Sequence, residues 1–404
     1  MSARAVTLLA ALLAAFALAA PAAAPAQQRP DISAPSAIVI EASTGDVVFE
    51  RKADEKRLIA STTKLMTALI ALEGVALDDT LTVSPYNAAP AESVANLRAG
   101  ERMRVADLLR ALLLASANDA ATTLANGISG SVPAFVREMN ARAKELGLRN
   151  TSYDNPVGLD GPRNRSTARD LVRLALVLRR DDFFRETVNR PRAALQSGAR
   201  KRTVLNRNRL VRDHAFVDGV KTGRTQQAGY VLVGSATRKG VTVLSAVLGE
   251  PGEAARDADT LALLRYGLGR YRRTTLVERN EVLREADLKY RDEQVDLVAA
   301  ESVQRVLRRG ERAQVRVLGA PAEIEGPTAA GARVGTVEVR VRGRTVARTP
   351  LITAAAVEEA SLSERLSEVL SRPASLLLVA LLLACTVSLV LLRRRVVQRA
   401  GGVR

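Results

Sequence analysis

The sequence predicts a first domain of the α/β (α+β) class, a small all-β domain after it, and one transmembrane helix near the carboxyl end. Three observations predict this order. Segment 34–270 begins and ends with strand-like alternation and carries helical patterns between. Segment 272–355 consists of short β-like pieces with glycine-rich turns, and segment 374–392 is an uncharged apolar run. A chain of 404 residues with 47% hydrophobic residues is long enough for two folded units.

Residues 1–26 have the pattern of a cleaved secretory signal peptide. Arg4 gives a basic start, an apolar stretch runs to about Ala20, and small residues at 24–26 offer a cleavage site. An uncleaved anchor is the alternative, but the alanine-rich end of the stretch argues against it. We therefore expect the folded part of the chain to be exported.

The first domain is expected to contain one sheet assembled from its two ends. Near the amino end, 36–41 and 46–50 form a strand pair with a turn at 44–45. Three further strand-like runs lie near the other end, at 216–221, 229–236 and 241–248. Helical spacing of apolar residues fills the segments between, at 61–73, 105–115, 119–126, 133–146 and 169–180. Strands at both ends with helices between them indicate one sheet assembled from the two ends of the domain.

The second domain, 272–355, has its clearest strand patterns at 314–318 and 336–341. Segment 357–373 follows and is rich in charge. It also carries apolar residues at helical spacing, namely Leu362, Leu366, Val369 and Leu370. We expect this segment to form a short amphipathic stalk.

The apolar run at 374–392 has about the length of 20 residues that a helix needs to cross a bilayer. Three arginines at 393–395 open the basic tail 393–404, and the positive-inside rule places such a tail in the cytoplasm. A buried core helix is the competing interpretation, but such helices are rarely so uniformly apolar. The sequence therefore predicts a single-pass protein of the cell membrane, with its bulk on the extracytoplasmic side.

Composition argues against several classes of function. The net charge of +17 comes mainly from scattered arginines without aromatic-basic motifs, so we expect no nucleic-acid partner. Compositional bias explains this charge, and attraction to anionic lipid or wall polymer remains open. The chain has one histidine, His214, and one cysteine, Cys385, which lies inside the apolar run. We therefore expect no metal, no cofactor, no disulfide and no thiol chemistry.

Three short motifs follow one another along the chain, and the first is Ser-Thr-Thr-Lys at 61–64. Residues three apart share a helix face, so Lys64 brings an amine beside the Ser61 hydroxyl. Burial and a second cation nearby shift such a lysine toward the neutral form that a base requires. Taken alone, the motif is more typical of a helix in which Ser61 is the N-cap. With a single histidine in the chain, a serine nucleophile needs a lysine as its base.

The second motif is Ser116-Ala-Asn118, in a loop between two helical patterns. Ser116 can relay a proton to a leaving amine, and Asn118 can hold an amide; alone, the motif is typical of a helix-capping loop. The third is Lys-Thr-Gly at 221–223, at a strand end. Its lysine and threonine suit a substrate carboxylate, and its glycine permits close backbone approach. Each motif is weak by itself, but chance does not explain three of them in this order and on these types of element. Together they indicate a site for acyl transfer.

With these motifs the chain resembles the D-alanyl-D-alanine carboxypeptidases, the low-molecular-mass penicillin-binding proteins of serine peptidase family S11. Five stretches carry the resemblance, namely 60–68, 115–121, 155–159, 166–170 and 217–223. The similarity covers about 34–250 and extends more loosely into the β domain at 331–339.

The resemblance implies a β-lactamase/transpeptidase-like fold and removal of the terminal D-alanine from peptidoglycan stem peptides. It implies Ser61 as nucleophile, Lys64 as its base and Ser116 as proton relay, with penicillins acylating the same serine. The substrate-binding residues that it implies are Asn118, Arg207, Lys221, Thr222, Gly223 and Arg224. Backbone N–H groups of Ser61 and Arg224 would form the oxyanion hole, where one donor lowers the barrier by about 3 kcal/mol.

Two features depart from the family pattern. Arg163-Asn164-Arg165 stands where relatives often carry a Gly-His pair, beside the site, so we expect an effect on substrate preference or deacylation. The chain also has a true membrane span where the family usually has an amphipathic helix. This second departure changes the anchoring and leaves the chemistry as it is.

Three other functions share features with this sequence. A class A β-lactamase adds a Glu-x-x-x-Asn element between the second and third motifs, whereas here that spacing, Glu92 to Asn96, precedes the second. A non-catalytic wall-binding scaffold gives no reason for the motif serines and lysines to occur together. A D,D-endopeptidase acting on cross-links uses the same acyl-enzyme, so the motifs leave that activity open.

Overall fold

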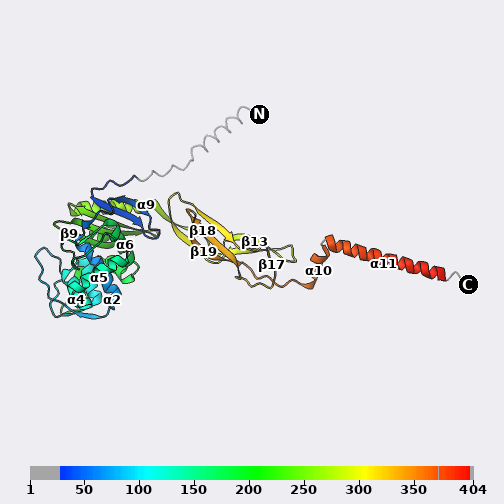
Figure 1. Ribbon diagram of the computed structural model, residues 1–404, viewed down its shortest axis with the longest axis horizontal. Coiled ribbons are helices and arrows are strands. Elements are labelled where there is room, and N and C mark those ends of the chain that lie inside the picture. The colour runs from blue at the N-terminus through cyan, green and yellow to red at the C-terminus, as the bar shows by residue number, and fades with distance from the viewer. Residues whose placement is uncertain (1–27, 372, 401–404) are drawn as a thin grey trace, which may run out of the picture. The chain divides into compact units, whose positions relative to one another are not determined.

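The computed structural model describes residues 28–371 and 373–400, and the chain divides after Arg272 into two compact units (Figure 1). The predicted signal peptide, 1–26, lies outside the described residues, as do the last four residues of the predicted tail, 401–404.

A five-stranded antiparallel sheet forms the centre of the first unit, in the order β2-β1-β11-β10-β9. Its strands are β1 (Ser36–Glu41), β2 (Val47–Arg51), β9 (Val217–Thr225), β10 (Gly229–Arg238) and β11 (Val241–Glu250). β1 pairs with β11, with Ile38 opposite Ala246, so the two ends of the domain meet in one sheet. The predicted sheet is therefore confirmed.

Helices cover both faces of the central strands. α9 (Glu253–Arg270) packs against β1, β10 and β11, and α6 (Ala168–Leu178) packs against β1 and β11. All six residues of β1 are buried, which explains its continuous apolar run, because a strand covered on both faces loses the alternation of a half-exposed one.

The remaining helices of this unit form a cluster beside the sheet. They are η1 (Ala60–Thr63), α2 (Lys64–Gly74), α3 (Val105–Arg110), η2 (Ala111–Ala115), α4 (Asn118–Ser129), α5 (Val132–Glu145), α7 (Asp182–Val188) and α8 (Arg209–Asp213). α2 is buried from Lys64 to Ala71, and this stretch is apolar apart from Lys64 and Thr67, as expected of a helix in the core. Ser131 caps α5 and Thr167 caps α6, each through its side-chain oxygen.

Two predicted helices differ in detail from the structure. The segment 61–73 begins with the 3₁₀ turn η1, and the α-helix starts only at Lys64. The segment 105–115 ends in the π-helical turn η2, whose last residue is followed by Ser116 in the left-handed conformation. Irregular turns of this kind are common at functional sites.

Three short strand pairs complete the unit. They are β3 (Arg57–Leu58) with β6 (Arg165–Ser166), β4 (Thr80–Thr82) with β5 (Arg102–Arg104), and β7 (Arg192–Leu195) with β8 (Arg202–Leu205). The sequence had not predicted these pairs, because strands of two to four residues carry too few positions for a periodic pattern.

The second unit contains a six-stranded sheet in the order β16-β18-β19-β14-β13-β17 and a two-stranded sheet, β12-β15. Its strands are β12 (Tyr271–Val277), β13 (Val282–Leu288), β14 (Gln294–Ala299), β15 (Val303–Arg308), β16 (Ala313–Leu318), β17 (Glu323–Ile324), β18 (Arg333–Val341) and β19 (Arg344–Thr353). Val337, Val339, Leu297 and Leu351 lie in its core. The predicted β domain is confirmed.

Two helices end the described chain, α10 (Leu362–Ser371) and α11 (Pro373–Ala400). Within α11, Leu376–Arg395 is long and apolar enough to cross a membrane, and its side chains are not buried in the protein. The predicted apolar helix is therefore present.

Candidate active site

Ser61 lies in the 3₁₀ turn that precedes the buried helix α2. Ala60, directly before it, has a φ of 46° and is buried, while Ser61 itself is partly exposed. The turn is closed by Thr62, whose backbone N–H and hydroxyl donate to Ile59 O at 3.1 and 2.6 Å. The fold thus leaves Ser61 accessible between buried neighbours.

Lys64 occupies the first position of α2 and is fully buried. Its Nζ donates to Ser61 Oγ at 3.0 Å, to Asn118 Oδ1 at 2.6 Å and to Val157 O at 2.5 Å. A neutral amine donates only two protons and accepts one. Of the three partners only the Ser61 hydroxyl carries a proton to give, so the neutral lysine is arranged to take that proton.

The electrostatic surroundings favour this neutral form. Burial, with a smaller contribution from the positive charge of Arg207, lowers the pKa of Lys64 to about 7, although the anions Glu92 and Asp119 oppose the shift. The amine is therefore available as a base near neutral pH, about where general-base catalysis is most efficient.

Val157 contributes a backbone acceptor that the sequence had not identified as part of the site. The loop is shaped by Asn155, whose Oδ1 accepts from the backbone N–H of Val157, Gly158 and Leu159 at 3.2, 2.6 and 3.1 Å. Gly158 has a φ of 88°, and a Cβ there would lie 2.1 Å from Ala60 O. The only sequence signal was Asn-Pro-Val-Gly within the stretch 155–159.

Ser116 and Asn118 flank the start of α4. Ser116 is buried with a φ of 62° and a ψ of 33°, a strained conformation for a residue other than glycine. Asn118 reaches Lys64, whereas no hydrogen bond within the described residues joins the Ser116 hydroxyl to Lys64 or Lys221. The relay role of Ser116 therefore stays a prediction.

The third motif lies on β9, whose backbone runs against the nucleophile turn. A Cβ at Gly223 would be 3.0 Å from the Ser61 nitrogen, so the strand and the nucleophile turn approach each other more closely here than a side chain ordinarily permits. Thr222 is buried beside it. The motif thus lies within reach of any group bound to Ser61.

Lys221 is buried as completely as Lys64, and its Nζ donates to Thr222 O at 2.8 Å. Burial lowers its pKa well below the usual value, and the charges of Lys64, Arg207 and Arg256 lower it further. The free site therefore favours the neutral form of Lys221. A substrate carboxylate would supply the missing counter-charge.

The two predicted arginines are exposed and differ in their contacts. Arg207 donates through Nε to Ala115 O at 2.8 Å and through its backbone N–H to Leu114 O at 3.0 Å. It therefore anchors the segment that leads into Ser116. Arg224 lies over the ring of Tyr230, with Cζ 5.3 Å from the ring centroid.

Segment 163–165, which departs from the family pattern, packs beside the turn that holds Ser61 and is hydrogen-bonded to it. Asn164 is buried, donates through Nδ2 to Leu159 O at 3.1 Å, and accepts from Thr63 Oγ1 at 3.3 Å. Arg163 is exposed and pairs with Asp154 at 2.9 Å. The asparagine therefore links the Val157 loop to the turn that holds Ser61.

Glu92 also belongs to this site, although it precedes the second motif in the sequence. Its Oε2 accepts from Asn118 Nδ2 at 2.7 Å and from the hydroxyl of Tyr86. From the sequence, Glu92 is assigned only to the class A β-lactamase spacing. The contact between Glu92 and Asn118 of the second motif was not predicted.

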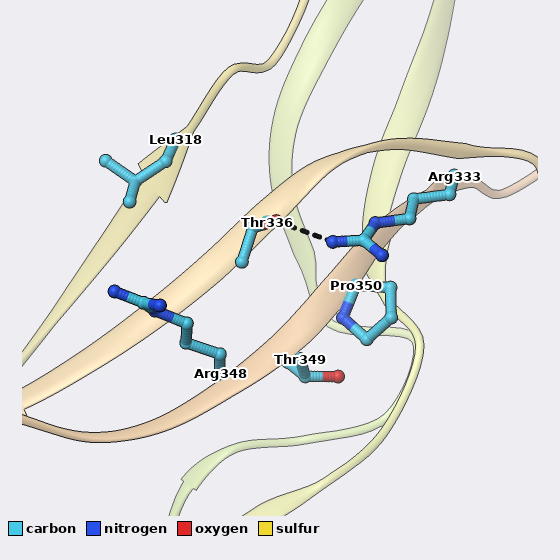
Figure 2. Close-up of a pocket in the computed structure, with 6 residues that line it drawn as sticks. All are labelled: Leu318, Arg333, Thr336, Arg348, Thr349 and Pro350. Carbon is cyan, nitrogen blue, oxygen red and sulfur yellow. Dashed lines mark hydrogen bonds between the residues drawn. The ribbon is translucent and has the colours of Figure 1, made fainter.

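The second unit has a hollow of about 440 Å³ that lacks this chemistry. It is lined by Leu318, Arg333, Thr336, Arg348, Thr349 and Pro350 (Figure 2). Arg333 donates to Thr336 Oγ1 at 3.1 Å, and Arg348 pairs with Glu338 at 2.9 Å. No lysine is among these lining residues, so neither threonine hydroxyl has a lysine beside it within the hollow, and we assign no acyl transfer to this hollow.

Two family matches cover the chain. Residues 23–252, more than half of it, match the Peptidase S11 family, described as D-alanyl-D-alanine carboxypeptidase. Residues 271–359 match the C-terminal domain of penicillin-binding protein 5.

Individual relatives agree with these matches. D-alanyl-D-alanine carboxypeptidase DacC of Escherichia coli is 32% identical over 348 residues, which covers 82% of this chain and 86% of the relative. D-alanyl-D-alanine carboxypeptidase DacF of Bacillus subtilis is 30% identical over 330 residues, which covers 79% of this chain and 84% of the relative.

Solved structures are similar over the same regions. Penicillin-binding protein 5 from Haemophilus influenzae has a TM-score of 0.59 at 28% identity and covers 83% of this chain and 100% of its own. The Streptomyces K15 DD-transpeptidase has a TM-score of 0.57 at 34% identity, covering 60% of this chain and 99% of its own.

Proposed function

Because the chain belongs to the S11 peptidase family of D-alanyl-D-alanine carboxypeptidases, we propose that Ser61 is its acylated nucleophile and that Lys64 is the base. As a member of this family the protein is a serine-type carboxypeptidase and a penicillin-binding protein. The observation that carries the proposal is the 3.0 Å contact between Lys64 Nζ and Ser61 Oγ.

The reaction begins when Ser61 Oγ bonds to the carbonyl carbon between the two terminal D-alanines. Neutral Lys64 takes the hydroxyl proton as that bond forms. The carbonyl oxygen becomes an oxyanion directed at the backbone N–H groups of Ser61 and Arg224, and one such donor lowers the barrier by about 3 kcal/mol. The site therefore stabilises the charge that develops in the transition state.

Collapse of this intermediate breaks the peptide bond and expels D-alanine. Its nitrogen takes a proton delivered through Ser116, and water then hydrolyses the ester at Ser61. The substrate carboxylate binds at Lys221 and Thr222, with Arg207 nearby, and Asn118 holds the peptide amide. Peptidoglycan stem peptides are the substrates in this proposal.

Penicillins use the same steps up to acylation. The β-lactam presents a carboxylate and a strained amide in a comparable arrangement, so it acylates Ser61. The activity on cross-links, as a D,D-endopeptidase, requires no residue beyond those named here. The choice between the two peptide substrates depends on the surface around the site.

The pH dependence of acylation tests the assignment of Lys64. Since the base is the neutral amine and the pKa of Lys64 is about 7, the rate of acylation is expected to rise as pH increases through about 7. The measurement is the rate of labelling by a fluorescent penicillin between pH 5.5 and 9. A rate that falls over this range would contradict a lysine base.

The location of the protein is proposed from α11. We infer that the apolar stretch Leu376–Arg395 crosses the cell membrane once, with the catalytic domain (34–270) and the β domain (272–355) outside and the basic tail in the cytoplasm. Deleting 374–404 is expected to move the protein from the membrane fraction to the soluble fraction while penicillin labelling persists. Retention of the truncated protein in washed membranes would argue against this anchor.

A further inference from the structure

The carboxylate of Glu92 has no role in the mechanism above, yet it lies one side chain away from the catalytic lysine. Glu92 belongs to the long loop between β4 and β5. Tyr86 donates its hydroxyl to Glu92 Oε2, and the backbone N–H of Ala89 donates to Oε1 at 3.1 Å. The loop thus holds its own carboxylate in place before that carboxylate reaches across to α4.

The contact across to α4 is made with the amide of Asn118. Asn118 Nδ2 donates to Glu92 Oε2 at 2.7 Å, and Asn118 Oδ1 accepts from Lys64 Nζ at 2.6 Å. A carboxylate only accepts hydrogen bonds, so Glu92 selects the amide orientation in which oxygen faces Lys64. With the amide turned over, its NH₂ group would face the amine and the contact would be lost.

The loop itself is tied to the start of α4 at several points. Asn118 donates its backbone N–H to Ser93 O at 2.7 Å. Asp119 accepts from the backbone N–H of Ala95 at 3.0 Å and of Leu97 at 3.0 Å. Glu92 is therefore presented to Asn118 by a well-supported segment.

Charge adds a second effect to this geometry. Burial alone raises the pKa of Glu92, but hydrogen bonds from Tyr86, Asn118 and Ala89 outweigh it and lower the pKa, so Glu92 is an anion. The charged groups that act on Lys64 are the anions Glu92 and Asp119 and the cation Arg207, and the buried amine of Lys221 lies close enough to be affected by Lys64. Tyr86, beside Glu92, is a neutral phenol because burial raises its pKa.

We propose that Glu92 is a positioning residue of the acyl-transfer site: it orients the Asn118 amide against Lys64 and sets the pH at which Lys64 begins to act as base. The proposal rests on the proposed function, in which neutral Lys64 activates Ser61. It gives the β4–β5 loop a direct part in acylation, through one carboxylate and one amide.

Glu92→Gln separates the two effects. A glutamine oxygen still accepts a hydrogen bond from Asn118 Nδ2, but the negative charge is gone. The protonated form of Lys64 therefore loses an anion that stabilises it. The acylation profile with fluorescent penicillin is expected to shift to lower pH by about one unit. Glu92→Asp keeps the charge and is expected to leave the midpoint near that of the wild type while the maximal rate falls.

Glu73→Gln is the matched control, because Glu73 lies at the far end of α2 and pairs at the surface with Arg142. Its profile is expected to coincide with that of the wild type. Thermal unfolding of each full-length variant shows whether it folds, and Glu92→Asp serves should Glu92→Gln not fold. A midpoint that stays put in Glu92→Gln, or that moves equally in Glu92→Asp, overturns the proposal. If the acylation rate of the wild type does not rise near pH 7, the assignment of Lys64 as the base is contradicted instead.

Discussion

Replacing Lys64 with methionine is expected to lower the rate of acylation by penicillin about 10³-fold at pH 8. The amine is the group beside Ser61 Oγ that is placed to accept its proton, and methionine fills a similar volume without a lone pair of comparable basicity. The remaining rate should lose its rise through pH 7, because no titrating base is left. Stopped-flow or gel-based labelling with a fluorescent penicillin gives both results.

Lys64→Met is also expected to fold. Removing the buried amine relieves its desolvation cost, but it leaves Val157 O and Asn118 Oδ1 without this donor, so the free energy of unfolding should fall by no more than about 2 kcal/mol. A variant that folds normally and still labels at the wild-type rate would contradict the role of Lys64 as base.

Replacing Gly158 with alanine is expected to lower the acylation rate at least about 100-fold, since displacements near 1 Å at a reacting centre have that effect. The added Cβ would meet Ala60 O at 2.1 Å and Ser61 Cα at 2.9 Å, and the φ of 88° disfavours any side chain. The turn that holds Ser61 and the loop that carries Val157 O must therefore separate. The free energy of unfolding should fall by about 2 kcal/mol or more.

Gly147→Ala is the control for the backbone effect alone. Gly147 also has a positive φ, 66°, but a Cβ there would meet nothing within 4 Å. It should lose about 1 kcal/mol of stability and keep the wild-type rate of labelling. Equal labelling rates in the two variants would show that the close approach at Gly158 does not matter.

The fold class and the family resemblance were predictable because both rest on local pattern. Apolar runs such as 36–41 and 241–248 are long enough to identify buried strands. The residues within each motif, such as Ser61 and Lys64, are separated by a short and fixed number of positions. These parts of the prediction are confirmed by the sheet order and by the family matches.

Other parts depend on contacts between distant segments. Val157 meets Lys64 across a separation of 93 residues, and the carboxylate of Glu92 meets Asn118 across 26. Neither residue belongs to a periodic pattern, and a single backbone acceptor has no side-chain signal. The π-helical turn before Ser116 is likewise invisible in Ala-Leu-Leu-Leu-Ala, because the surrounding packing selects it.

The most direct test of the account is release of free D-alanine from a peptide that ends in D-Ala-D-Ala, measured with the full-length chain in detergent. The wild type is expected to release D-alanine continuously and Ser61→Ala to release none, with both proteins folded to the same thermal midpoint. Release that persists in Ser61→Ala would contradict the assignment of the nucleophile. Absence of both release and penicillin labelling in the wild type would contradict the acyl-enzyme mechanism as a whole.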